Sequence, residues 1–293
     1  MRGVAHLPSF GDFSDSMAKY ITIFDSQFYP DYIEDAKSLY EEVFTEFGRL
    51  LTDSSSSSDL LTLISNKPNP LRTQLMRLFR KYVSPDTSVE MLKKKGEIPK
   101  IIENFGLRFR DITLVRESFV SRGQPDESLA VLLYEYKDRG QKGYDLTTEF
   151  FRWFRARFAD EFAIIGPEKA GKDVILKSYL PKFHLSTPAD FLISMPDGTP
   201  LVVGFARYDS DRGGSQEDDR IKGNRDNVTE IMRYSKQQGI PLRILFLNDG
   251  PGLLLGSMWR DYASLEEYGD GSVLVATLKM LEDRVTENWI SGK

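Results

Sequence analysis

Residues 188–219 read PADFLISMPDGTPLVVGFARYDSDRGGSQEDD, and this stretch decides the fold that the sequence predicts. Asp197-Gly198 is a strong turn signal, and the alternation on both sides of it is typical of strands. A turn centred there places Asp190 opposite Phe205 in an antiparallel ladder. Because side chains alternate between the two faces of a strand, Arg207 and Asp209 are predicted to share the face of Asp190.

The predicted hairpin ends in a dense group of charges. Two carboxylates and a guanidinium meet at the strand end, and the following loop adds Asp211, Arg212, Glu217, Asp218, Asp219 and Arg220. Such a group fits a site that holds a divalent metal and a phosphate. The alternative is a structural ion pair between Asp190 and Arg207 beside a solvated acidic loop.

The composition excludes several kinds of site. The chain has 293 residues, 40% of them hydrophobic, which is enough for two modest domains or one domain with a large extension. It has no cysteine and only two histidines, so disulfides, thiolate zinc sites and cysteine nucleophiles are excluded and a serine–histidine triad has little basis. Hydrolytic chemistry would therefore rest on carboxylates and a hard metal ion such as Mg²⁺.

The distribution of charged and apolar residues indicates a cytoplasmic protein. The N-terminal MRGVAHLPSF lacks the apolar core of a signal peptide, and the apolar runs are too short to span a bilayer, so we expect no membrane partner. The formal net charge of −5 argues against a generally basic nucleic-acid binder. Local patches of charge therefore matter more than the total.

Residues 1–125 are predicted to form a helical N-terminal region that helps to bind DNA. The apolar spacing from Ile21 to Leu51 is helical, interrupted at Pro30, and the serine-rich segment 53–59 is predicted to be a mobile loop. Residues 71–82 read as an amphipathic helix in a locally basic segment, whose alternative role is a solvated face packed on an acidic domain. The predicted DNA contacts are Arg72, Arg77, Arg80, Lys81, Lys93 and Lys94, with Arg212, Gln216 and Arg220 of the later loop.

Residues 126–293 are predicted to form an α/β core with a mixed sheet. Helices are expected at 126–136 and 146–158 with a turn at 138–143 between them, followed by strands at 161–165, 173–176, 189–195 and 201–208. A helix at 224–238, a strand at 242–247, a helix at 257–268, a strand at 273–278 and a short terminal helix complete the chain. A helix, three meandering strands, a helix and a strand give a mixed sheet flanked by helices.

This order of elements, with Pro188-Ala189-Asp190 on the second strand and Arg207-Tyr208-Asp209 on the third, resembles the PD-(D/E)XK nuclease superfamily, best known from type II restriction endonucleases. The resemblance covers roughly residues 146–278. It implies a restriction-endonuclease-like core and a magnesium-dependent enzyme that cuts double-stranded DNA as a homodimer. Within it, the catalytic residues would be Asp190, Arg207, Asp209 and Glu149, and the metal ligands Asp190, Asp209 and Asp211.

The chain also departs from the pattern of that superfamily. One residue is inserted between Pro188 and Asp190, the third strand has no lysine, and Arg207 and Asp209 are transposed relative to the usual order of acid and base. Both side chains would still lie on one face of the strand. If the transposed site is inactive, the chain would instead be a DNA-binding protein that keeps the nuclease fold without catalysis.

A competing motif, GPEKAGKD at residues 166–173, has the spacing of a P-loop. Asp173 stands where a P-loop needs a hydroxyl, and the following sequence is β-branched and unlike a phosphate-binding helix. We therefore expect a turn into a strand and no nucleotide cofactor. Residues 248–252, NDGPG, are expected to form a tight turn at a sheet edge, where α/β folds commonly bind ligands.

Overall fold

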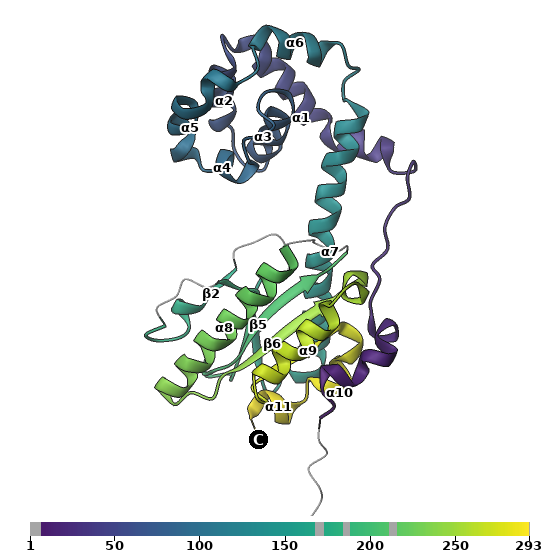
Figure 1. Cartoon of the computed structure of the whole chain (residues 1–293), viewed down its shortest axis with the longest axis vertical. Coiled ribbons are helices and arrows are strands. Elements are labelled where there is room, and N and C mark those ends of the chain that lie inside the picture. Colours follow the sequence, from purple (N-terminus) through teal and green to yellow (C-terminus); the bar gives the residue numbers. More distant parts are fainter. Residues whose placement is uncertain (1–6, 168–172, 184–187, 211–215, 293) are drawn as a thin grey trace, which may run out of the picture. The chain divides into compact units, whose positions relative to one another are not determined.

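The computed structural model of the chain describes residues 7–167, 173–183, 188–210 and 216–292 (Figure 1). The chain divides into two compact units, Ser26–Lys137 in one and Met1–Asp25 with Asp138–Lys293 in the other. A single boundary was expected after residue 125, whereas the structure has one boundary after Asp25 and another after Lys137. The described residues before Ser26 pack with the sheet. Helix α7 (Glu127–Phe158) begins in the first unit and ends in the second.

The first unit is helical, as predicted. Apolar residues at helical spacing, such as Tyr40, Phe44 and Phe47, are buried in a core that its helices share. The helix expected at 71–82 is confirmed with those bounds. Besides the start of α7, the unit contains α1 (Ile33–Asp53), α2 (Ser57–Ser65), α3 (Leu71–Tyr82), α4 (Val89–Lys93), α5 (Ile98–Phe105) and α6 (Ile112–Val120), with short 3₁₀ turns η2 (Lys95–Glu97) and η3 (Gly106–Arg108).

The serine-rich segment is a tight junction between two helices, and the prediction of a loop at 53–59 was wrong. The hydroxyl of Ser54 donates to the carbonyl of Leu50 (2.7 Å) at the end of α1. The side chain of Ser56 accepts from the amide of Asp59 (3.1 Å) and caps the start of α2. Short polar side chains can satisfy helix ends in this way, which their composition alone does not reveal.

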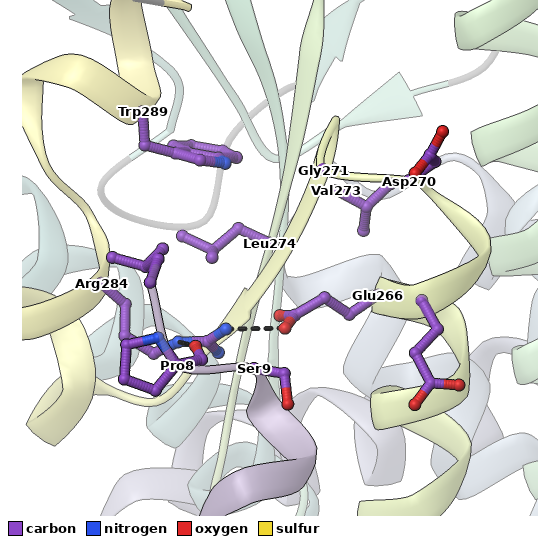
Figure 2. A pocket seen from close by; sticks show the side chains of 11 residues that line it. Pro8, Ser9, Glu266, Asp270, Gly271, Val273, Leu274, Arg284 and Trp289 are labelled. Atoms are coloured by element: carbon purple, nitrogen blue, oxygen red, sulfur yellow. Dashed lines mark hydrogen bonds and ion pairs between the residues drawn. The ribbon is translucent and has the colours of Figure 1, made fainter. Parts of the chain in front are cut away.

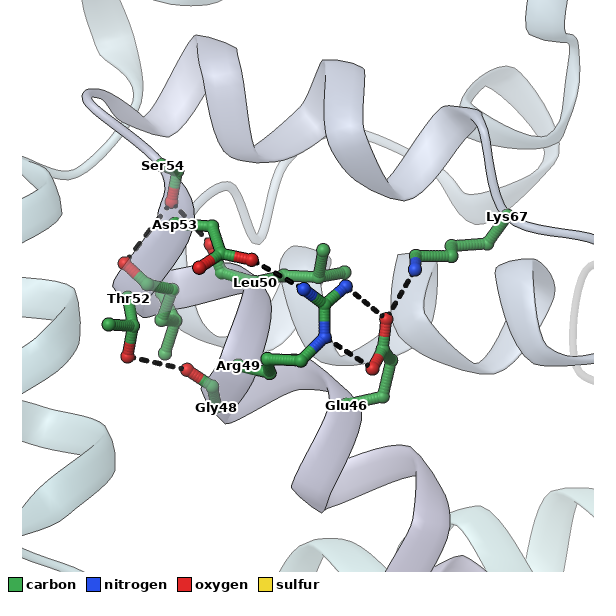
Figure 3. A network of polar contacts seen from close by, with 9 residues as sticks. Glu46, Gly48, Arg49, Leu50, Thr52, Asp53, Ser54 and Lys67 are labelled. Carbon is green, nitrogen blue, oxygen red and sulfur yellow. Dashed lines mark hydrogen bonds and ion pairs between the residues drawn. The ribbon is translucent and has the colours of Figure 1, made fainter.

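A network of ion pairs fixes the last turns of α1 (Figure 3). Glu46 accepts from Arg49 (2.8 Å) and from Lys67 (2.5 Å), and Arg49 also contacts Asp53 (2.5 Å). The hydrogen bond from Arg49 and the nearby Lys67 hold the pKa of Glu46 at about 2, although burial acts in the opposite direction. The basic side chains of Arg49 and Lys67 therefore stabilise the fold of this unit.

The second unit is built on a mixed five-stranded sheet, which confirms the α/β class. Strands β1, β4 and β5 form an antiparallel meander, and β5, β6 and β7 are parallel, so β5 is the strand at which the two halves meet. Their bounds are β1 (Ala163–Ile165), β4 (Phe191–Ser194), β5 (Pro200–Tyr208), β6 (Arg243–Asp249) and β7 (Val273–Ala276). A separate pair is formed by β2 (Val174–Ile175) and β3 (Pro188–Ala189).

Helices α8 and α9 connect the parallel strands and lie across one face of the sheet (Figure 1). The remaining elements of this part are α8 (Gln216–Gln238), α9 (Met258–Tyr268), α10 (Leu281–Arg284), α11 (Glu287–Ser291) and the 3₁₀ turns η4 (Leu176–Ser178), η5 (Pro251–Leu254) and η6 (Leu278–Met280). Parallel strands need such crossover helices.

Helix α7 packs against the opposite face of the sheet through aromatic side chains. The ring of Phe191 lies 4.8 Å from that of Phe150 and 6.0 Å from that of Phe151. The same ring lies over Gly204, where a Cβ atom would come within 1.9 Å of it. This packing extends over the last turns of α7, which is one continuous helix, so the turn expected at 138–143 was wrong.

The N-terminal segment packs along α9 and then across the strand ends. In η1 (Phe10–Tyr20), the ring of Phe10 stacks on Trp259 at 4.2 Å. The amide of Thr22 donates to Asp249 (2.7 Å), and the hydroxyl of Tyr208 donates to the carbonyl of Thr22 (3.1 Å). These bonds explain why the helix expected from Ile21 begins only at Ile33.

Candidate active site

The β4–β5 hairpin has the register that the sequence predicts. Phe191 pairs with Gly204, so Asp190, directly before β4, lies opposite Phe205. The amide of Asp190 donates to the carbonyl of Gly204 (2.9 Å), and its carboxylate accepts from the amide of Ala206 (2.8 Å). The backbone of β5 therefore fixes this carboxylate at the start of β4.

Asp190 and Arg207 line one pocket of about 300 Å³ on the α8 and α9 side of the sheet. Its floor includes Phe205 and Phe246, whose rings stack at 5.2 Å. The wall is formed by residues of both helices. The lining consists of Asp190, Phe205, Ala206, Arg207, Phe246 and Asn248 from the strand region, Gly223, Asn224 and Asn227 from α8, and Tyr262 from α9.

The carboxyl group of Asp190 is the main titratable group of the pocket. Burial raises its pKa above the ordinary 3.8, and the nearby carboxyl group of Asp173 raises it further. The hydrogen bond from Ala206 and the charge of Arg207 lower it, but burial dominates. A carboxyl group with a raised pKa in a pocket is a common feature of functional sites.

Arg207 and Asp209 are brought together, as predicted, but Arg207 is half-exposed in the pocket and Asp209 is buried beside it. The guanidinium Nε of Arg207 donates to the Oδ1 of Asp209 at 2.7 Å, and the two side chains are 43% and 3% exposed. Asp209 packs beneath residues 250–252, since its carbonyl accepts from the amide of Gly252 (2.8 Å). Gly250, at a φ of 103°, leaves room for the backbone of Asp209, which a Cβ atom would approach within 2.4 Å. Asp209 is not among the described residues that line the pocket.

The described residues offer a magnesium ion few protein ligands. Among them, no three acidic or histidine side chains form a cluster suited to a metal ion. Asp211, the third predicted ligand, lies outside the described residues. Mg²⁺ typically binds one or two carboxylates and completes its coordination with water and substrate phosphates. Asp190 fits that limited role, because Ala206 occupies only its Oδ2 atom.

Glu149 lies on α7 and pairs with Arg152 at 2.5 Å. It is not among the described residues that line the pocket, and the acidic group whose charge acts on Asp190 is Asp173. The catalytic role expected for Glu149 stays a prediction.

The basic residues predicted to contact DNA are partly engaged within the helical unit. Arg77 donates to Gln74 and lies over the ring of Tyr136, Arg80 donates to the carbonyl of Pro85, and Lys93 pairs with Glu90. Arg72 is half-buried, whereas Lys81 and Lys94 are exposed. Arg212 and the side chains of Gln216 and Arg220 lie outside the described parts of the chain.

The elements that flank the competing P-loop motif are not the ones that a P-loop requires. Most of its loop, residues 168–172, lies outside the described residues, but the flanking elements are clear. The motif is preceded by β1 and followed by β2, which pairs with β3, where a P-loop requires a helix. The expected strand is confirmed at Val174–Ile175, whereas the expected turn before it lies largely outside the described residues.

Several pocket residues were not singled out by the sequence. Asn224 and Asn227 lie one turn apart on a helix whose orientation depends on tertiary packing, and Tyr262 reads as an ordinary core aromatic. Asn248 stands in the NDGPG segment, which we expected to form a turn near ligands. Its neighbour Asp249 is structural: its carboxylate accepts from the amides of Thr22, Gly250 and Leu278 (2.7–2.9 Å), although burial raises its pKa.

A second cavity, of about 440 Å³, is lined by residues near both ends of the described chain (Figure 2). Its charged pair, Arg284 and Glu266, is joined at 2.7 Å. Arg284 also donates to the carbonyl of Pro8 (3.2 Å), and Glu266 accepts from the amide of Phe10 (2.7 Å). These groups hold the N-terminal segment against the sheet unit, so the cavity is a weaker candidate for a functional site.

Comparisons of the chain with protein-family models, with curated proteins and with solved structures gave no match. Among the described helices, none is both long and apolar enough to cross a membrane.

Proposed function

We propose that this chain is a magnesium-dependent double-strand DNA endonuclease of the restriction type, acting as a cytoplasmic homodimer. One observation carries the proposal: Asp190 and Arg207 line the same pocket at the strand ends of a mixed sheet. A carboxylate that can bind a hard cation and a guanidinium that can bind a phosphate are two groups that metal-assisted phosphodiester cleavage can use. The order of elements, a helix, an antiparallel meander, a helix and a parallel strand, is the order that we associated with the nuclease superfamily.

Each predicted site residue has a proposed role in the reaction. Mg²⁺, when bound, would supply a water of lowered pKa and neutralise charge on the scissile phosphate. Asp190 would hold the ion, with Asp209 and Asp211 as further proposed ligands and Glu149 as an accessory acid. Arg207, oriented by Asp209, would bind the phosphate and stabilise the charge that develops on it. An arginine stays protonated at neutral pH and cannot act as the general base.

The helical unit would contribute electrostatic contacts to the DNA backbone. Of the predicted contacts whose side chains the structure describes, Lys81 and Lys94 are the most exposed. Each lysine or arginine that binds a phosphate releases condensed counterions, so binding should weaken as salt increases. A homodimer would place two pockets on the two strands of a symmetric site.

The second candidate is a DNA-binding protein that has the sheet core without catalysis. One observation favours it: Asp209 is nearly buried and bonded to Arg207, so a single carboxylate, that of Asp190, lines the pocket among the described residues. Such a site would bind a phosphate through Arg207 but would hold a metal ion weakly.

Digestion of a complex DNA substrate followed by sequencing of the ends separates the two candidates. The endonuclease would leave ends at a recurring sequence when Mg²⁺ is present and none when EDTA is added. Retention of DNA on the protein without new ends, with either Mg²⁺ or Mn²⁺, would favour the non-catalytic protein.

A further inference from the structure

We infer that Asn248 is a phosphate-binding residue, whose side-chain Nδ2 donates a hydrogen bond to an anionic oxygen of a phosphate group held against Arg207. The inference rests on the proposed function, because it assigns the ligand of that pocket to the phosphate of a nucleic acid. It gives a specific contact to Asn248, which the sequence places only within the NDGPG segment at a sheet edge.

The amide group of Asn248 lacks a partner where one is expected. The residue is 2% exposed, and its Nδ2 atom makes no hydrogen bond within the described parts of the chain. Buried polar groups in native proteins nearly always have a partner in the protein, a water molecule or a ligand. The amide nitrogen carries two donor hydrogens and cannot bind a cation, so its missing partner is an acceptor.

The position of Asn248 identifies the class of ligand. Asn248 on β6 pairs in register with Arg207 on β5, so the two side chains project from the same face of the sheet, and both line the 300 Å³ pocket. The Nε atom of Arg207 is bonded to Asp209, which leaves the four N–H groups of its terminal nitrogens as donors. A guanidinium and a carboxamide side by side suit an acceptor with several anionic oxygens, and a phosphate group has that chemistry.

The rest of the pocket fits a phosphate that belongs to a nucleotide. Asn224 and Asn227 add carboxamide groups from α8, and the stacked rings of Phe205 and Phe246 form an apolar floor. Amide groups can bind the hydroxyl groups and carbonyls of a nucleotide, while the apolar floor excludes water from the phosphate contacts.

The test is an NMR titration of the ¹⁵N-labelled full-length chain in EDTA, so that no metal or cleavage is involved. One series uses inorganic phosphate and another a 5′-phosphorylated thymidine dinucleotide, with the unphosphorylated dinucleotide as reference. The side-chain amide of Asn248 is assigned by its absence from the Asn248→Ala spectrum. If the phosphate group alone suffices, we expect this signal to shift with inorganic phosphate and with the 5′-phosphorylated dinucleotide. If the nucleic-acid backbone is required, we expect it to shift with the 5′-phosphorylated dinucleotide only.

The variants give a second measurement. Asn248→Ala should weaken binding of the dinucleotide about tenfold, as expected for one hydrogen bond to a charged group. The matched control is Thr277→Val, because Thr277 is also fully buried with an Oγ1 atom that has no partner in the described residues, yet does not line the pocket. Its affinity should equal that of the wild type.

Two results would overturn the inference. One is an Asn248 signal that does not move at phosphate concentrations that shift the backbone amide of Arg207. The other is unchanged affinity in a folded Asn248→Ala variant, and if that variant does not fold, the wild-type titration decides alone. Phosphate binding through Asn248 without any DNA cleavage would refute the endonuclease while supporting this inference.

Discussion

Arg207 and Asp209 stand two residues apart at the end of β5 and are joined by a 2.7 Å bond from the guanidinium Nε to the carboxylate Oδ1. The side chain of the arginine is 43% exposed and that of the aspartate 3% exposed. One partner therefore faces the pocket, and the other lies in the interior of the protein. A buried carboxylate that binds one edge of a guanidinium fixes the direction of its remaining donors. In this arrangement the first role of Asp209 is to orient Arg207.

Arg207→Ala should reduce stability as well as DNA binding. It removes the guanidinium that pairs with the nearly buried carboxylate of Asp209, which we expect to lower the free energy of unfolding by about 2 kcal/mol, less than for a fully buried pair because Arg207 is half-exposed. Urea unfolding measures this. An unchanged midpoint of urea unfolding would show that the buried carboxylate of Asp209 does not need Arg207 for stability.

Asp190→Asn should leave the protein at least as stable as the wild type near neutral pH. Burial raises the pKa of Asp190 above 3.8, so the folded state binds the proton more tightly and wild-type stability decreases as pH rises from 3.8 through the higher folded value. The variant lacks this dependence, so its relative stability should increase between pH 4 and pH 7. Thermal unfolding at several pH values tests it, with the exposed Asp226→Asn as the control. A relative loss of stability with rising pH would contradict this account.

Gly204→Ala should disrupt the packing of α7 on the sheet. The new Cβ atom would lie 1.9–2.2 Å from atoms of the Phe191 ring, which is fully buried and contacts Phe150 and Phe151. We expect a loss of about 3 kcal/mol in the free energy of unfolding. Gly143→Ala on α7 is the control, since nothing lies within 4 Å of its Cβ position, and it should stabilise the helix slightly. Equal effects of both substitutions would be inconsistent with the clash.

Glu46→Gln should destabilise the helical unit in a pH-dependent way. The bond from Arg49, with Lys67, lowers the pKa of Glu46 from 4.5 to about 2, so its stabilising effect is complete above pH 4.5 and disappears as pH falls toward 2. We expect a loss of about 1 kcal/mol at pH 7, because the partners are partly exposed to solvent. The free energies of unfolding of the wild type and the variant at pH 7 and pH 2 measure this loss. The exposed Glu90→Gln, which removes the surface pair with Lys93, should have a smaller effect.

The parts of the fold that were predictable follow from local patterns. Asp197-Gly198 marks the turn of the hairpin, and beside the site its strands have the register that places Asp190 opposite Phe205, although the pairing shifts by one residue between Ile193 and Ser194. Residues 71–82 formed the expected helix because their apolar residues recur at helical spacing. In each case, the residues that carry the signal are close together in the sequence.

The parts that were missed depend on contacts between distant residues. The segment from Ile21 has helical spacing, but Thr22 binds Asp249, 227 residues away. Gly140 and Gly143 suggest a turn, yet α7 continues through both. The pocket is completed by α8 and α9, and no periodicity in the sequence shows that Asn224, Tyr262 and Asn248 meet there.

The most direct test of the central claim is cleavage of supercoiled plasmid DNA by the purified full-length chain and its variants. We predict linear products at defined sites with Mg²⁺ for the wild type and for Asp226→Ala, whose exposed carboxylate lies on α8. Asp190→Ala should give none, and EDTA should stop the wild type. Cleavage by Asp190→Ala at the wild-type rate would contradict the account, as would plasmid that stays intact with wild-type protein on every substrate that contains the sequences it binds.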